Sequence, residues 1–66
     1  MSFWLFVNAC NKYSFTFSIS THGQISIMLR PNNTFENLYI NQDCYNRGFS
    51  KLFLKAIKEM KRYRGK

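Results

Sequence analysis

Two stretches of the chain, at positions 13–20 and 25–30, carry apolar residues at every second position, and Met28 is the one apolar residue between them. The apolar positions are Tyr13, Phe15, Phe17, Ile19, Ile25, Ile27 and Leu29. A period of two is typical of a half-buried β-strand. The polar positions are mostly serine and threonine, so one face of each strand is expected to meet solvent. The pattern therefore predicts an antiparallel hairpin with one apolar face.

The length of the connecting loop sets the register of this hairpin. A two-residue turn would place Ile19 opposite Ser26 and mix the two faces. A three-residue loop over residues 21–23 instead pairs Ile19 with Ile25 and Phe17 with Ile27. Such a loop favours a left-handed residue at its last position, where Gly23 stands. We therefore predict the three-residue loop.

The apolar run at residues 3–7 raises a question of export, because it is followed by Cys10. The run is shorter than a signal sequence requires, and no lysine or arginine precedes it. Phenylalanine, tryptophan and valine favour strands, so we expect a first β-strand here in a cytoplasmic protein. Residues 35–40 are a candidate fourth strand.

In the last third of the chain, the spacing of the apolar residues changes from every second residue to the spacing of three and four residues that is typical of a helix. The apolar side of the helical wheel carries Phe49, Leu52, Phe53, Ala56, Met60 and Tyr63. We expect a helix over residues 43–64, with Asp43 or Asn46 as its N-cap and Gly65 as its stop. The predicted fold class is α+β. It is a small antiparallel meander of three to four strands (residues 3–40) with one C-terminal amphipathic helix packed on its apolar face.

A chain of 66 residues is expected to form a single small domain with a limited core. We predict that strand and helix residues share this core. Its expected members are Phe17, Ile27, Phe53, Ala56 and Met60.

The charge of +7 is concentrated in one part of the chain. Residues 1–46 hold two basic and two acidic side chains, whereas residues 47–66 hold eight basic side chains and only Glu59 as an acid. This asymmetry predicts a polyanionic partner, either nucleic acid or an acidic protein surface. The candidate nucleic-acid-binding residues are Arg47, Lys51, Lys55, Lys58, Lys61, Arg62 and Arg64.

Residues suited to catalysis or metal binding are scarce. The chain has one histidine, His22, and its acids are Glu36, Asp43 and Glu59. No CxxC pair and no phosphate-binding glycine loop is present. We therefore expect no enzyme activity, no cofactor and no metal site. Two cysteines are too few for a disulfide framework, and we interpret them as small, partly buried apolar residues, with one disulfide as the alternative.

Two functions fit this pattern. The first is a small basic nucleic-acid-binding accessory protein that contacts phosphates through the C-terminal helix. The alternative is a small interaction or inhibitor protein, of the type encoded by phages and mobile elements, that binds a nucleic-acid-handling host protein. Phe3, Trp4 and Phe6 form a possible interface, because one face of the first run stays uncovered. A homodimer is a further expectation, and membrane binding is not expected.

Overall fold

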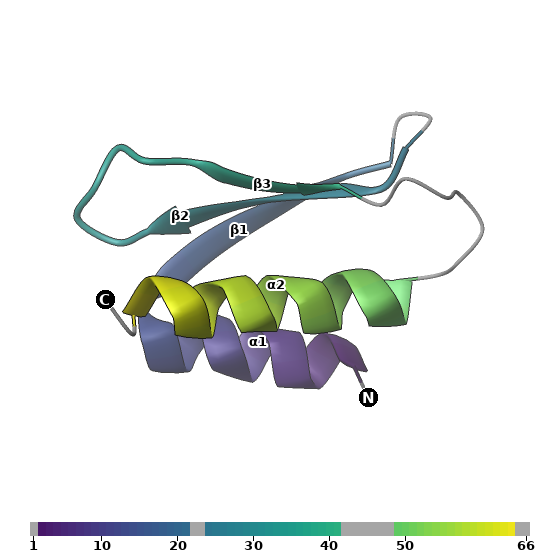
Figure 1. Ribbon diagram of the computed structural model, residues 1–66, viewed down its shortest axis with the longest axis horizontal. Coiled ribbons are helices and arrows are strands. Elements are labelled where there is room, and N and C mark those ends of the chain that lie inside the picture. The colour runs from purple at the N-terminus through teal and green to yellow at the C-terminus, as the bar shows by residue number, and fades with distance from the viewer. Residues whose placement is uncertain (1, 22–23, 42–48, 65–66) are drawn as a thin grey trace.

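The structure is a computed structural model that describes residues 2–21, 24–41 and 49–64. The chain forms α1 (Ser2–Tyr13), β1 (Phe15–Ser20), β2 (Ser26–Pro31), β3 (Leu38–Asn41) and α2 (Phe49–Arg64). The strands make one antiparallel sheet in the order β1-β2-β3. Both helices lie on the same side of this sheet (Figure 1). The α+β class is confirmed.

The first run of apolar residues is a helix, so the predicted strand at residues 3–7 is wrong. In α1 the side chains of Phe6, Ala9 and Cys10 are buried. Their spacing of three and four residues places them on one helical face. Packing of this face overrides the strand preference of the individual residues.

Within the described residues the helical layer therefore contains two helices, where the sequence predicts one. The rings of Phe3 and Phe53 lie 5.7 Å apart near the start of both helices, and Arg64 reaches the carbonyl of Tyr13 near their ends. The two helices thus run in the same direction, side by side (Figure 1). The candidate N-cap residues Asp43 and Asn46, and Gly65 beyond the helix, lie outside the described residues.

The register of the β1–β2 hairpin differs from the prediction by two residues. Ile19 lies opposite Ile27, and Phe17 lies opposite Leu29. The connection therefore spans residues 21–25 and not 21–23. Apolar side chains still face apolar side chains, because a shift of two residues keeps every side chain on its own face.

Three strands are found among the described residues, and the sheet begins at Phe15 and not at Phe3. The segment that the sequence identifies as a candidate fourth strand supplies β3, which pairs with β2 through Ile27 opposite Ile40. A four-stranded sheet is thus not shown.

The core lies between the sheet and the helix pair. Its buried members are Phe6, Ala9, Cys10, Phe15, Ile27, Leu29, Ile40, Leu52, Phe53, Ala56 and Met60. Four of the five predicted core residues belong to it. The exception is Phe17, whose side chain is 36% exposed. Phe17 lies on an edge strand, and its ring packs against those of Phe3 and Phe6 from the side.

A left-handed residue joins α1 to β1. Ser14 has a φ angle of 61°, and its carbonyl accepts a hydrogen bond of 2.8 Å from the backbone N–H of Asn32. A left-handed residue after the last helical position is a common way to end a helix, and glycine is the residue that does this without steric cost. The sequence pattern predicts Tyr13 and Ser14 as part of the strand, and this is wrong, because Tyr13 is the last residue of α1 and β1 begins at Phe15.

Replacement of Ser14 by glycine should stabilise the protein. The substitution removes the clash between Cβ and the backbone at positive φ, and the free energy of unfolding should rise by about 0.5–1 kcal/mol. The measurement is urea unfolding followed by circular dichroism. Ser18→Gly is the matched control within β1, where φ is not positive, and it should lower stability by about 0.5–1 kcal/mol. Equal effects at both positions would contradict this account.

Replacement of Phe53 by alanine should cost about 3–5 kcal/mol. The ring of Phe53 stacks on Phe6 at a centroid distance of 5.0 Å, and the side chain is only 5% exposed. Phe35 is 93% exposed, so Phe35→Ala is the same chemical change outside the core and should leave stability almost unchanged. Thermal melting of both variants tests this, and similar melting temperatures for the two would show that the helix pair is not the centre of the core.

Candidate functional site

Four basic residues of α2 form a row on the side of the helix that points away from the core. We call Lys51, Lys55, Lys58 and Arg62 the basic stripe; all four are exposed. Their positions follow the spacing i, i+4, i+7, i+11, which brings them to one face of a helix. The buried residues Leu52, Ala56 and Met60 occupy the opposite face. The amphipathic pattern that packs α2 thus also aligns its cations.

Two members of the basic stripe have partners within the protein. The Lys55 ammonium donates a hydrogen bond of 3.4 Å to the carbonyl of Asn41, and Arg62 forms an ion pair of 2.8 Å with Glu59. The Arg62 side chain is 74% exposed, and an ion pair at such a surface contributes about 0–1 kcal/mol. Neither Lys51 nor Lys58 pairs with an acid among residues 2–21, 24–41 and 49–64.

Arg64 and Lys61 lie off the basic stripe. Arg64 Nε donates a hydrogen bond of 2.9 Å to the carbonyl of Tyr13, and the guanidinium lies 5.9 Å from the ring centre of Phe15. A cation at the end of α1 is favoured by the negative end of the helix dipole. Arg64 therefore stabilises the junction between α1 and α2. Of the remaining predicted residues, Arg47 lies outside the described part of the chain.

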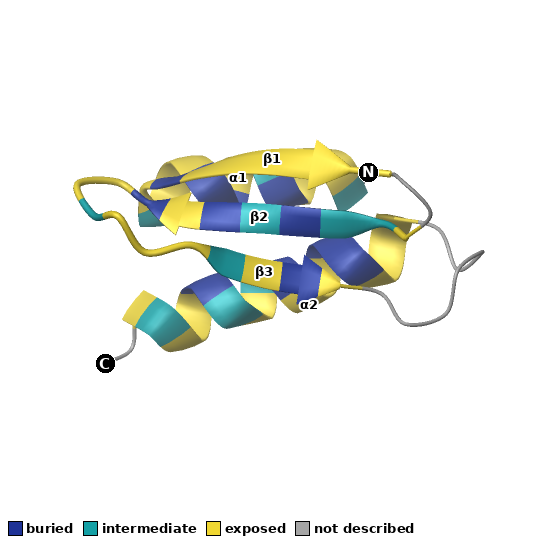
Figure 2. Ribbon diagram, turned by 90° about the horizontal axis from the view of Figure 1, so that it is seen from above, coloured by how far each residue is buried: buried dark blue, intermediate teal, exposed yellow. Residues whose placement is uncertain are grey.

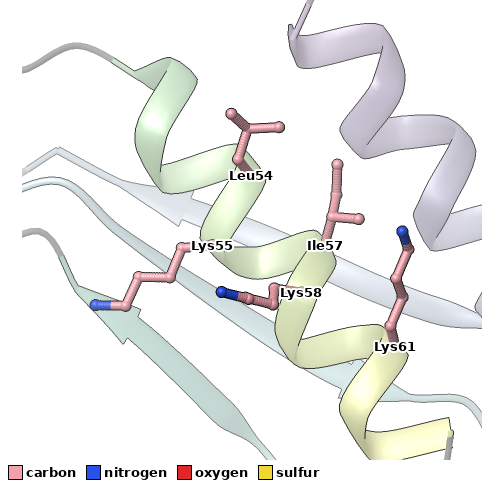
Figure 3. Close-up of a pocket in the computed structure, with 5 residues that line it drawn as sticks. All are labelled: Leu54, Lys55, Ile57, Lys58 and Lys61. Atoms are coloured by element: carbon pink, nitrogen blue, oxygen red, sulfur yellow. The ribbon is translucent and has the colours of Figure 1, made fainter.

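An apolar groove runs between the two helices on the side away from the sheet. It has a volume of about 360 Å³ and is lined by Leu5, Asn8, Ala9, Lys12, Tyr13, Leu54, Ile57 and Lys61. Leu5 and Leu54 are more than half exposed. Figure 3 shows Leu54, Ile57 and Lys61 on the side of α1, with Lys55 on the side of β3. Lysines thus border an apolar strip on the outer face of the helix pair.

The predicted interface residues separate into exposed and buried ones. Trp4 is 64% exposed and Phe3 is 42% exposed, whereas Phe6 is fully buried against Phe53. Phe6 is therefore a core residue and not part of a surface. Ile19, which the sequence does not suggest as an interface residue, is 37% exposed on β1. The absence of charge from residues 15–20 is a signal that could have revealed this apolar edge.

Several of the described polar residues form side-chain hydrogen bonds. The Tyr63 hydroxyl donates a hydrogen bond of 3.1 Å to Glu36. This bond, aided by partial desolvation and the negative charge of Glu36, raises the pKa of Tyr63. No group of three or more metal-binding side chains occurs within the described ranges. His22, Asp43 and Cys44 lie outside them.

Cys10 is a free thiol buried in the core. Its side chain is 3% exposed, and its sulfur forms no disulfide with any described residue. Burial raises the pKa of the thiol from 9.0 to about 11, because a thiolate would lose its hydration. Cys10 therefore serves as a small apolar residue of α1.

Comparison of the chain with protein-family models, with curated proteins and with solved structures yields no significant match. Among the helices that the structure describes, none has the length and apolarity needed to span a membrane.

The Cys10 thiol should make stability depend on pH in the alkaline range. Because its pKa is raised in the folded protein, the stabilisation is complete below pH 9.0 and is lost as the pH rises towards about 11. The total loss should be about 2–3 kcal/mol. Urea unfolding should be compared between Cys44→Ser and the double variant Cys10→Ala/Cys44→Ser. The difference in unfolding free energy between the two should shrink by this amount from pH 8 to pH 11, and a constant difference would contradict the raised pKa.

Proposed function

We propose that the protein is a nucleic-acid-binding accessory protein that contacts phosphates through the basic stripe. The observation that carries the proposal is the exposure of Lys51, Lys55, Lys58 and Arg62 on one face of α2. Like charges at a spacing of four residues destabilise a helix by about 0.2–0.5 kcal/mol each. A helix surface that served only solubility would be expected to mix basic and acidic residues. An anionic partner therefore accounts for the basic stripe.

The dimensions of the stripe suit a phosphate backbone. Eleven positions separate Lys51 from Arg62, which corresponds to about 16 Å along a helix axis. Double-stranded DNA carries one negative charge for about every 1.7 Å of its axis, so the stripe can lie along several phosphates. Glu59 does not prevent this, because its exposed ion pair with Arg62 is weak enough to exchange for a phosphate.

The partner is expected to be bound through its charge and not its base sequence. Lysine is a compact cation on a flexible stem and contacts phosphates without a fixed orientation. Contacts to phosphates position a protein but carry no sequence information. We propose a cytoplasmic protein with no catalytic role, in line with the free, buried thiol of Cys10.

A second candidate function is that of an interaction or inhibitor protein. The groove between Leu5 and Leu54, bordered by Lys12 and Lys61, favours this alternative. Such a groove matches an amphipathic helix with an apolar stripe and acidic flanks, as in helix-in-groove recognition. The host protein would then be held by α1 and α2 together, and the basic stripe would guide its approach.

A salt series tests the nucleic-acid proposal. With about four phosphates neutralised, the slope of log affinity against log salt should be about −4 on duplex DNA and shallower on a single strand. Affinity should fall by about two to three decades between 50 and 200 mM salt. The measurement is fluorescence anisotropy with labelled duplex DNA, duplex RNA and single strands of the same sequence. Absence of binding at 50 mM salt to all of these probes would reject the proposal and favour the inhibitor function.

Two lysine variants distinguish binding through the basic stripe from binding through the overall positive charge of the protein. Lys58→Ala should flatten the salt slope by about one unit. Lys61→Ala removes the same charge from the same helix, but Lys61 lies beside α1 and off the stripe, so its slope should stay close to that of the parent. Equal slopes for the two variants would show that the stripe is not the contact surface.

A further inference from the structure

The free edge of β1 is a surface on which nothing in the described structure packs as a neighbouring strand. The sheet order is β1-β2-β3, so β1 pairs on one side only. Proteins usually protect such an edge with lysine, proline, a bulge or a very short strand. β1 has six residues, FTFSIS, with neither a charge nor a proline. β3, the other edge, has four residues, and Lys55 binds the carbonyl of Asn41 at its end.

The hydrogen bond between Asn32 and Ser14 shows which backbone groups point out of this edge. The carbonyl of Ser14 accepts from the N–H of Asn32, in the same register as the β1–β2 pairs. Residues in an antiparallel pair face the neighbouring strand alternately. Residues 16, 18 and 20 therefore direct their N–H and C=O groups towards β2. Phe15, Phe17 and Ile19 direct theirs outward, where no strand among the described residues receives them.

The same odd-numbered residues carry the apolar side chains of β1. Phe17 and Ile19 are 36% and 37% exposed, and the Phe17 ring lies 6.5 Å from that of the half-exposed Phe3. Trp4 lies 5.9 Å from Phe3 and is 64% exposed. An apolar surface thus continues from the edge of β1 onto α1. A contiguous patch of this kind usually marks an interface.

The distribution of charge indicates that a second copy of the chain covers the free edge of β1. Between residues 2 and 20 the only charged side chain is that of Lys12. The basic stripe belongs to α2, and Figure 2 shows α2 on the β3 side of the sheet, away from β1. Two copies can therefore meet along β1 while their basic stripes stay far apart. An acidic partner would find no charged residue on β1 itself, and Arg64, which lies against Phe15, already donates a hydrogen bond to the carbonyl of Tyr13.

We propose that the protein forms a two-fold symmetric dimer in which β1 pairs antiparallel with β1 of a second copy. The axis passes between Phe17 and its counterpart, so that Phe15 lies opposite Ile19 on both sides. This register pairs all the outward N–H and C=O groups of Phe15, Phe17 and Ile19. It also keeps apolar side chains on the helical side of both sheets. The two sheets become one continuous sheet, and the interface is isologous.

Exchange of backbone amide protons with deuterium tests the pairing directly. At low protein concentration the N–H groups of residues 15, 17 and 19 should exchange fast, while those of residues 16, 18 and 20 should be protected by β2. At high concentration both sets should be protected. The measurement is two-dimensional NMR of nuclease-treated protein, with analytical ultracentrifugation at the same concentrations. A monomer throughout, or a dimer in which residues 15, 17 and 19 still exchange fast, would overturn the proposal.

A pair of lysine variants provides the control. Ile19→Lys introduces a charge on the apolar side of the edge and should yield a monomer at concentrations where the parent is a dimer. Ser18→Lys adds the same charge to the same strand, on the face that stays exposed, and should remain a dimer. Circular dichroism confirms that both variants fold. Equal dimerisation of the two folded variants would overturn the proposal, even if the salt slope on nucleic acid matched our expectation.

Discussion

The contact between Phe6 and Phe53 holds the fold together. Their rings stack at 5.0 Å and join the two helices, which come from opposite ends of the chain, into one layer. A domain of this size has little core to spare, so a pair of large aromatic side chains contributes much of its stability. The position of α1 beneath β1 depends on this contact. So does the orientation of α2, because burial of Phe53 and Ala56 turns the basic stripe towards solvent.

The sequence predicts a helix or a strand correctly where the pattern of apolar residues fits only one of the two. Alternation over residues 15–20 and 26–30 indicates strands, and the spacing of buried residues in α2 fits only a helix. Residues 3–7 were misinterpreted because phenylalanine and tryptophan favour strands, although Phe3, Phe6 and Cys10 also repeat with a helical spacing. Only packing against α2 decides between the two. The register of the hairpin was predicted wrongly for a related reason. A shift of two residues leaves apolar and polar side chains on the same faces, so the sequence pattern does not distinguish the two registers.

Within α2, the helical spacing is enough to predict which basic residues share one face. Spacing alone places Lys51, Lys55 and Lys58 in a row, since a helix is regular. The roles of Arg64 and Lys61 depend on α1, and no pattern within α2 reveals that neighbour. The free edge of β1 likewise follows from the strand order and from the register with β2, both of which are properties of the assembled sheet.

The distance in sequence between partners has a consequence for how the chain folds. Arg64 and Tyr13, which meet at the ends of the two helices, are 51 positions apart. Contacts of this range slow folding, because a long loop must close before any stabilisation is gained. The hairpins can form early from local contacts, whereas α1 must wait for α2. During that delay the aromatic face of α1 is exposed to water. Aggregation from this state, and not from the native one, should therefore limit the yield of folded protein at high concentration.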